Sequence, residues 1–301
     1  MSSSPPTAAA SYYGQGPVLR LTRLGLALTQ QLWPALAVRA ALRLFGTPLP
    51  PRWLRRGRPW PAHWAHERWP FERASLTLYR DGHADPRAPA VLLVHGWGGH
   101  AGQMLSLAQA LADAGLQVLL LEMPAHGRSA GRTSNLPQFA RALEYVAARL
   151  QAQGMDLQAV VAHSLGANAA AYAASRGLAL QRLVLLAPPA SPYEYTRLFA
   201  RLFGLSERTR GAMQQRIEAR EAILMPQFEP PAVGPRITAP TLIVHDRGDR
   251  INGHADGQAY ARAIAGAQLV STEGLGHMKL LQDRAVQAEV TRFVSAALRP
   301  R

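Results

Sequence analysis

The sequence predicts an α/β protein, in which a mostly parallel, doubly wound sheet carries a helical cap insertion and follows an N-terminal helical extension. Two observations support this fold class. Short runs of Val, Leu and Ile without polar alternation, typical of strands covered on both faces, alternate with helical patterns over most of the chain. The alternation is interrupted once, at 188–240, by a stretch far longer than an ordinary connection. We therefore expect an insertion over one edge of the sheet.

Strand and helix candidates follow one another in a regular order, which favours right-handed crossovers within one sheet. The apolar runs that predict strands lie at 91–94, 118–121, 159–162, 183–186, 241–244 and 268–270. The patterns that predict helices between them lie at 103–114, 136–153, 166–176, 257–265 and 282–298. A weaker strand candidate at 75–79 precedes the first run, and it is a candidate for antiparallel pairing with the sheet.

Four zones follow from this order. They are a disordered tail over 1–16, a basic, tryptophan-rich helical extension over 17–73, a core over 74–190 and 236–301, and a helical cap over 191–235. Within the cap, the spacing predicts two helices, near 193–203 and 206–225.

The composition excludes several classes of protein. The chain has 301 residues, 48% of them hydrophobic and 17% charged, so it is neither wholly disordered nor a coiled coil. It contains no cysteine, which excludes disulfides, thiolate nucleophiles and cysteine metal sites. No apolar run reaches the length of a membrane span, about 20 residues, and the start lacks the basic and apolar regions of a secretory signal. We therefore expect a cytoplasmic protein.

Positive charge is concentrated at the start of the chain. The net charge is +14, and residues 1–70 hold nine arginines against one acidic residue, which gives +8. Leucines at helical spacing precede four tryptophans there, at Leu21, Leu24, Leu28, Leu32 and Leu36, then Trp53, Trp60, Trp64 and Trp69. Because arginine and tryptophan suit a lipid headgroup zone, residues 17–70 are a candidate for peripheral contact with the inner face of a membrane. Packing on the rest of the chain, or a dimer contact, is the alternative. Nucleic-acid binding is not expected, since no recognisable module accompanies the charge.

The strongest sign of chemistry is the segment AVVAHSLGA at 159–167, where an apolar strand runs into Ser164 and small residues then begin a helix. A serine on such a sharp turn presents its hydroxyl at the carboxyl end of the sheet. The turn needs small neighbours two positions before and after the serine, and Ala162 and Gly166 meet that need. A buried serine in an ordinary tight turn is the alternative.

A serine nucleophile needs a base, and a carboxylate that orients the base. The loop after the strand at 241–244 contains Asp246 and Asp249, and a glycine-rich loop after the next strand contains His277. The order Ser, Asp, His suits acid and base on successive loops at one sheet edge. We prefer Asp249 as the partner of His277 because it lies further along its loop. Asp246 is expected to accept loop N–H groups instead.

A glycine-rich loop, HGWGGH, follows the strand at 91–94. Acyl transfer develops negative charge on an oxygen, and each backbone N–H aimed at that oxygen can contribute about 3 kcal/mol. We expect these donors at Leu165, directly after the nucleophile, and at Trp97. A phosphate-binding loop is the alternative, but the segment has neither the dinucleotide fingerprint nor the lysine of a P-loop.

These motifs resemble those of the α/β-hydrolase superfamily, in order and over about residues 75–298. The segments HGWGG, EMPAHGRS, AHSLG, HDRGD and GLGH correspond to its landmarks, with mild departures at Glu122, Ala125 and Ala162. The pattern is most similar to the branch of serine esterases, lysophospholipases and serine aminopeptidase-like enzymes with a helical cap. The resemblance implies that no cofactor is needed, and that the catalytic set is Ser164, Asp249 and His277 with an oxyanion hole at Trp97 and Leu165.

We therefore expect a serine hydrolase that cleaves carboxylic esters, with a small-molecule acyl ester as its substrate. The cap offers an apolar acyl pocket at Leu198, Phe199, Leu202 and Phe203. Peptidase, thioesterase and C–C-bond hydrolase activities share the same triad and stay open. The alternative of another class is a non-catalytic protein of this fold, which acts on a membrane surface or a protein partner through its basic arm.

Four further histidines flank strand ends, at His95, His126, His163 and His245. In the family pattern such histidines brace loops through hydrogen bonds. No metal site is expected, because neither an H-x-x-x-H pair nor a carboxylate cluster accompanies them.

Overall fold

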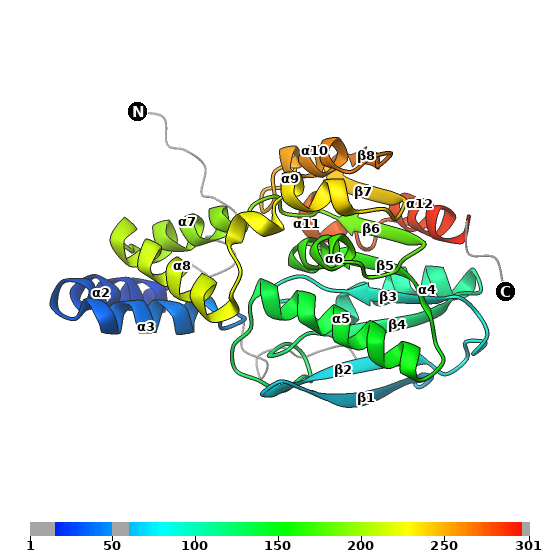
Figure 1. The fold of residues 1–301 in the computed structure, drawn as a ribbon, viewed down its shortest axis with the longest axis horizontal. Helices are drawn as coiled ribbons and strands as arrows, with labels where there is room; N and C mark the ends of the chain where they lie inside the picture. Colours follow the sequence, from blue (N-terminus) through cyan, green and yellow to red (C-terminus); the bar gives the residue numbers. More distant parts are fainter. Residues whose placement is uncertain (1–15, 50–59, 297–301) are drawn as a thin grey trace.

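One eight-stranded sheet lies at the centre of the part of the chain that the computed structural model describes, residues 16–49 and 60–296 (Figure 1). The strand order is β1-β2-β4-β3-β5-β6-β7-β8. β3 to β8 are parallel, whereas the pairs β1–β2 and β2–β4 are antiparallel. The predicted fold class is confirmed, including an antiparallel strand at 75–79. The strands are β1 (Trp64–Phe71), β2 (Ala74–Asp81), β3 (Ala90–Val94), β4 (Gln117–Glu122), β5 (Leu157–His163), β6 (Arg182–Leu186), β7 (Thr241–Asp246) and β8 (Gln268–Thr272).

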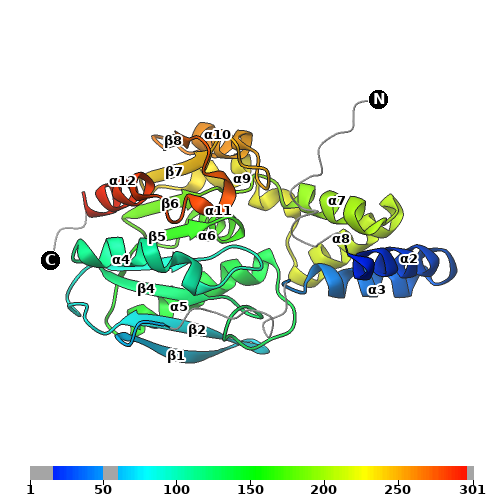
Figure 2. The same ribbon diagram turned by 180° about the vertical axis from the view of Figure 1, so that it is seen from behind.

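Helices cover both faces of the sheet (Figures 1 and 2). They are α4 (Leu105–Asp113), α5 (Leu136–Ala152), α6 (Leu165–Ser175), α10 (His254–Ala263) and α12 (Arg284–Ser295). Leu92 and Val94 of β3 pack in the cluster beneath α5 and α6. Val91 and Leu93 of the same strand pack in the cluster beneath α4 and α12. Both faces of the strand are therefore buried, which explains why its sequence shows no polar alternation.

Short helical turns complete the connections around the sheet. They are η2 (Ala101–Met104), η3 (Met225–Phe228), α9 (Pro230–Val233), η4 (Gly234–Arg236) and α11 (Gly276–Lys279). The last of these carries His277, which the sequence placed in a glycine-rich loop.

The cap insertion and the N-terminal helices lie together at one end of the molecule (Figures 1 and 2). Leu26 and Val38 from the N-terminal pair pack against Phe203 and Met213 of the cap, in an apolar cluster separate from the two clusters on the sheet. The helices on both sides are thus joined by a small core of their own. They are α2 (Pro17–Leu32), α3 (Pro34–Phe45), α7 (Pro192–Phe203) and α8 (Glu207–Glu221).

The side-chain amide of Gln30 fastens α2 to the turn between α7 and α8. Its nitrogen donates to the carbonyl of Gly204 at 3.1 Å, and its oxygen accepts from the N–H of Ser206 at 2.6 Å. One side chain thereby satisfies two backbone groups at the ends of the cap helices, where such groups lack partners within the helix.

The expectation of a helical extension over 17–73 is wrong for its last part. Residues 64–71 form β1, the edge strand that pairs with β2. Trp69 and Phe71, two positions apart, are buried on one side of this strand, as in a half-covered strand. Pro70 is tolerated because an edge strand has an unpaired side. In the sequence, the tryptophan-rich composition of this segment hides the period of two that marks the strand.

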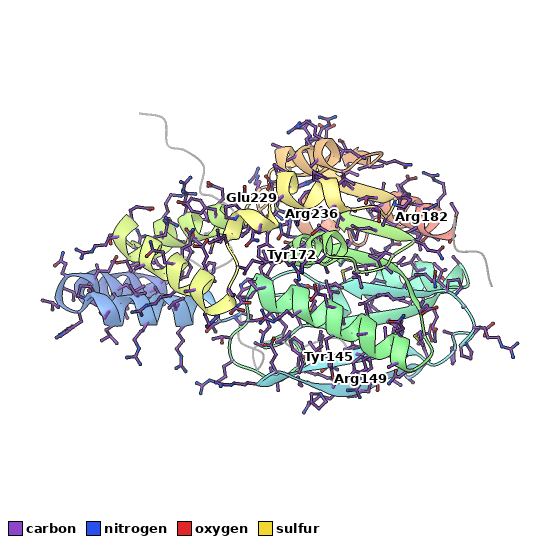
Figure 3. The ribbon with its side chains drawn as sticks, in the orientation of Figure 1. Tyr145, Arg149, Tyr172, Arg182, Glu229 and Arg236 are labelled. Carbon is purple, nitrogen blue, oxygen red and sulfur yellow. The ribbon has the colours of Figure 1, made fainter. Side chains whose placement is uncertain are left out.

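Three tryptophans of the extension, Trp60, Trp64 and Trp69, pack on the core. Trp69 lies against Tyr145 of α5, with ring centroids 6.3 Å apart, and the Arg149 guanidinium lies 4.5 Å from its ring. Figure 3 labels Tyr145 and Arg149 on this helix. Trp60 stacks on Tyr79 at 3.9 Å. These tryptophans are therefore part of the sheet packing. Trp53, the arginines that surround it, and the tail expected over 1–16, apart from its last residue, lie outside the described residues.

The role of Gln30 can be tested with the substitution Gln30→Ala. Loss of two hydrogen bonds should weaken the contact between α2 and the cap by about 1–2 kcal/mol. Amide hydrogen exchange within α2 should then become about 5- to 30-fold faster. The matched control is Gln31→Ala, since Gln31 is the exposed neighbour on the same helix. Equal acceleration in both variants would show that helix propensity, rather than the clamp, is responsible.

Candidate active site

Ser164 occupies the turn between β5 and α6, at the carboxyl end of the parallel strands. Its backbone has φ +55° and ψ −126°, a conformation that a residue other than glycine rarely adopts. Such a conformation costs about 1–3 kcal/mol and is retained where the surroundings enforce it. The N–H of Ser164 donates to the carbonyl of Leu186 in the neighbouring strand at 2.9 Å. The hydroxyl is therefore held on a strained, fixed turn.

Close backbone packing explains the small residues around this serine. A Cβ on Gly166 would lie 2.5 Å from the carbonyl oxygen of His95, and a Cβ on Gly96 would lie 2.7 Å from the Cβ of Ser164. Both contacts are too short for any side chain. Ala162, two positions before the serine, is completely buried. The turn is thus formed by two loops that only glycine allows to meet.

The structure brings Ser164, His277 and Asp249 together in one line. The His277 Nε2 lies 3.0 Å from the Ser164 Oγ, and the His277 Nδ1 lies 2.7 Å from the Asp249 Oδ2. The three residues come from the end of β5, from α11 and from the loop after β7. When Nδ1 carries the proton, it donates a hydrogen bond to the Asp249 carboxylate. Nε2 is then unprotonated and can accept a hydrogen bond from the serine hydroxyl.

Asp249 is held as an anion by its surroundings. Its side chain is buried, which by itself would raise its pKa, but hydrogen bonds from histidines and from loop N–H groups lower the pKa well below the usual range. The N–H groups of Ile251 and Asn252 donate to its Oδ1 at 2.8 and 3.1 Å. His245 Nε2 lies 3.5 Å from the same carboxylate. The negative charge beside His277 is therefore maintained at neutral pH.

Asp246 has a different place. Its carboxylate accepts from the N–H groups of Gly248 and Leu275, each at 2.9 Å, and from the Thr272 hydroxyl at 2.9 Å. Burial opposes ionisation, but these donors lower the pKa of Asp246. Of the two aspartates, Asp249 meets His277, while Asp246 joins the loop after β7 to the segment that precedes His277.

His163 contacts both the backbone and the ring of His277. Its Nε2 donates to the backbone carbonyl of His277 at 3.0 Å, and the two rings lie 4.6 Å apart. Burial, and then the neighbouring imidazole of His277, lower the pKa of His163 to about 3. His163 is therefore neutral at physiological pH, which avoids a second positive charge next to His277.

Other polar groups brace the glycine-rich loop. The N–H of Gly98 donates to His126 Nε2 at 3.0 Å, and the N–H of Met123 donates to His95 Nε2 at 3.2 Å. These histidines hold loops, as expected. Glu122 accepts from the N–H of Arg128 at 2.6 Å and from the Tyr79 hydroxyl at 3.1 Å, and burial raises its pKa.

No cluster of three or more His, Asp or Glu suited to a metal ion occurs within 16–49 and 60–296.

An apolar cavity of about 370 Å³ opens beside Ser164. Trp97 and Leu165, the residues expected to provide oxyanion donors, both line it together with Ser164 and His277. The volume lies in the range of small-molecule sites. The cavity therefore adjoins both the hydroxyl and the glycine-rich loop.

Only half of the expected cap lining reaches the cavity. Leu198 and Phe199 line it, whereas Leu202 and Phe203 lie one turn further along α7 and pack toward the N-terminal helices. No pattern in the sequence of the cap indicates that α2 and α3 cover this part of it. The same arrangement brings in an unexpected residue, Phe45 of α3, which lines the cavity with its ring centroid 5.1 Å from that of Phe199.

Asn252 and Tyr195 also belong to the site, although no sequence pattern indicates them. The Asn252 Nδ2 donates to the carbonyl of Ala187 at 2.7 Å and lies 3.5 Å from the Ser164 Oγ. The hydroxyl of Tyr195, a cavity-lining residue of the cap, donates to the Asn252 Oδ1. A polar link thus runs from α7 to the serine. No spacing rule marks either residue, since one lies on an irregular loop and the other within an inserted helix.

The low pKa of His163 predicts a pH effect on stability. An unfolded histidine titrates near about 6.5, so between about pH 6.5 and 3 the unfolded chain binds one more proton than the folded protein does at His163. The free energy of unfolding then falls as the pH falls through this window, by up to roughly 1.4 kcal/mol per pH unit.

The variant His163→Gln keeps an N–H donor and removes the titration, so its stability should fall less steeply between pH 7 and pH 5. Urea unfolding at several pH values measures this slope. The control is His83→Gln, which removes one imidazole from an exposed position. Identical slopes for the wild type and His163→Gln would refute the prediction.

Two family models match the chain in succession. The model for serine aminopeptidase, S33, matches residues 85–227, and the model for TAP-like protein matches residues 223–301. A comparison with curated proteins finds no match.

Solved structures share the fold at low sequence identity. The esterase Pf2001 of Pyrococcus furiosus has a TM-score of 0.63 at 19% identity and covers 84% of this chain and 98% of its own. A putative lipase of Acinetobacter baumannii AYE has a TM-score of 0.59 at 18% identity, with 79% and 92% covered. A bacterial membrane phospholipase A has a TM-score of 0.59 at 17% identity, with 93% and 97% covered. Together with the two family models, which match 85–301 in succession, these structures show that the chain has the α/β-hydrolase fold.

Proposed function

We propose that this protein is a serine hydrolase that cleaves carboxylic esters through an acyl-enzyme on Ser164. The observation that carries the proposal is the line of hydrogen bonds from Asp249 through His277 to the Ser164 Oγ, at 2.7 and 3.0 Å. Nucleophile, base and orienting carboxylate in this geometry form the arrangement that activates a serine hydroxyl.

In the first half of the reaction, the Ser164 Oγ attacks the acyl carbon while His277 Nε2 takes the hydroxyl proton. The tetrahedral intermediate places its negative oxygen toward the backbone N–H groups of Trp97 and Leu165. As the intermediate collapses, His277 gives its proton to the leaving oxygen. The alcohol departs, and the acyl group stays bound to Ser164.

In the second half, His277 takes a proton from water, and the resulting hydroxide attacks the acyl carbon. The Ser164 Oγ leaves and recovers its proton from His277, which releases the carboxylic acid. Asp249 fixes the tautomer of His277 and stabilises its positive form in both halves, for which its low pKa keeps it charged.

The surroundings of the serine favour an ester with an apolar acyl group. Aliphatic and aromatic side chains from the core, the cap and α3 line the cavity beside the hydroxyl. The structural neighbours named as an esterase and a lipase agree with an ester substrate. Peptidase, thioesterase and C–C-bond hydrolase activities use the same three groups, so the assay below includes an amide analogue.

Labelling by a fluorophosphonate probe tests the nucleophile. The wild type should be labelled, and Ser164→Ala should lose all labelling because the probe bonds only to an activated hydroxyl. Ser134→Ala is the matched control, since Ser134 is also a buried serine that lines the cavity, and its labelling should persist. A folded wild-type protein that resists the probe would support the alternative of a non-catalytic protein acting through its basic arm.

The two aspartates offer a second test. Asp249→Asn removes the carboxylate that orients His277 and should lower kcat by about 10³-fold or more. Asp246→Asn loosens the loop but leaves that carboxylate in place, so kcat of the folded protein should fall by less than about tenfold. Hydrolysis of p-nitrophenyl butyrate and octanoate, with the anilide analogue for comparison, measures both. Equal losses would contradict the assigned role of Asp249, and faster anilide hydrolysis would contradict the ester preference.

A further inference from the structure

A row of large apolar side chains is exposed on α2 and the start of α3. Six residues, 52–68% exposed, form this leucine face, which consists of Leu21, Leu24, Leu28, Leu32, Trp33 and Leu36. They account for six of the nine large hydrophobic residues exposed in the described part of the chain. Of the other three, Ile251 and Met278 line the cavity beside Ser164, and Leu224 lies after α8 in the cap. Single exposed apolar residues are ordinary, whereas a contiguous row marks an interaction surface.

The same two helices carry only positive charge. Arg20, Arg23, Arg39 and Arg43 are all exposed, and residues 16–49 contain no Asp or Glu. None of the ion pairs found in the described residues includes any of these four arginines. Their charges are therefore available to an anionic partner.

The opposite side of the helix pair is already occupied. Leu26, Val38 and Ala41 are buried against the cap, and Gln30 fastens α2 to the turn between the cap helices. The orientation of the pair is thus fixed, and the leucine face points away from the cap cluster. In the described residues no helix has both the length and the apolar character to cross a bilayer. A surface of this kind suits attachment to a membrane rather than insertion through it.

We propose that the leucine face and its four arginines dock this protein on the surface of an anionic lipid bilayer. The leucines and Trp33 would enter the boundary between headgroups and acyl chains, while the arginines bind lipid phosphates. A second copy of the chain is a poorer occupant, because it would bring two sets of unpaired arginines together without an acidic partner.

The docking surface is structurally connected to the cavity. α3 carries Leu36 on the leucine face and Phe45 on the cavity wall. Nine residues of α-helix separate them by about 14 Å along the axis. Docking would thus hold the cap side of the cavity close to the lipid surface.

Sedimentation of the full-length protein with vesicles tests this proposal. Vesicles of phosphatidylglycerol and phosphatidylcholine should carry the wild type down at low salt, and vesicles of phosphatidylcholine alone should carry down much less. Raising the salt concentration should weaken the association, since exposed charges are screened. Ser164→Ala should sediment like the wild type, so that failure of the proposed catalysis and failure of docking are distinguishable.

Two pairs of variants locate the contact. Leu28→Glu should lower the partition coefficient at least about tenfold, whereas Leu224→Glu, at an equally exposed leucine elsewhere, should change it less than about twofold. Replacing Arg20, Arg23, Arg39 and Arg43 with Gln should lower it more than about tenfold, since each basic residue contributes up to about fivefold at low salt. The matched control replaces four other exposed arginines with Gln, namely Arg73, Arg87, Arg262 and Arg284.

Urea unfolding curves establish that each variant is folded. Three results would overturn the proposal. One is a wild type that does not sediment with the anionic vesicles. Another is an equal loss in both arginine sets, which would show that only net charge matters. The last is a wild-type dimer that Leu28→Glu converts to a monomer, which would assign the leucine face to a second copy of the chain.

Discussion

The contact of two glycine-containing loops around Ser164 is the constraint on which the rest of the site depends. Gly166 passes close to the carbonyl of His95, and Gly96 passes close to the Cβ of the serine, so the backbone of Ser164 has no room to relax from its positive φ. The buried parallel strands β3 and β5, which are neighbours in the sheet, hold the turn in this costly conformation. His277 and Asp249 reach this fixed serine from α11 and from the loop after β7.

The groups that fix the backbone around His277 differ from the carboxylate that meets its imidazole ring. Asp246 holds the N–H of Leu275, and His163 holds the carbonyl of His277, so the backbone is fixed before and at the imidazole. Asp249 then needs only to orient the ring. This division of roles explains why two aspartates and two histidines lie close together in space, although His163 and His277 are 114 positions apart in sequence. It also explains why His163 is neutral while Asp249 is charged.

Much of the core could be predicted because the patterns that specify it lie within short stretches of sequence. Strands covered on both faces read as apolar runs, and the turn at Ser164 has a spacing set by sterics. The preference for Asp249 over Asp246 followed from distance along a loop, and the structure places the two aspartates accordingly. The departure at Glu122 is accommodated, since its carboxylate accepts several hydrogen bonds around the turn.

What could not be predicted depends on contacts between distant segments. The edge strand β1 has too few buried positions to stand out from a cluster of tryptophans. Asn252 and Tyr195 meet only because α7 folds back over the loop after β7. Leu202 and Phe203 have the right chemistry for a pocket wall, but α2 and α3 occupy the space they face. Each of these outcomes is a property of packing that no single segment encodes.

The presence of Phe45 in the cavity wall bears on how substrate range could be altered in this protein. A chimera that received only another enzyme's cap insertion would retain the Phe45 ring from the N-terminal pair. That ring would then lie against foreign cap residues in place of Phe199. Grafting or evolving new selectivity would therefore have to treat α3 and the cap as one exchangeable unit, although about 150 residues of chain separate them in sequence.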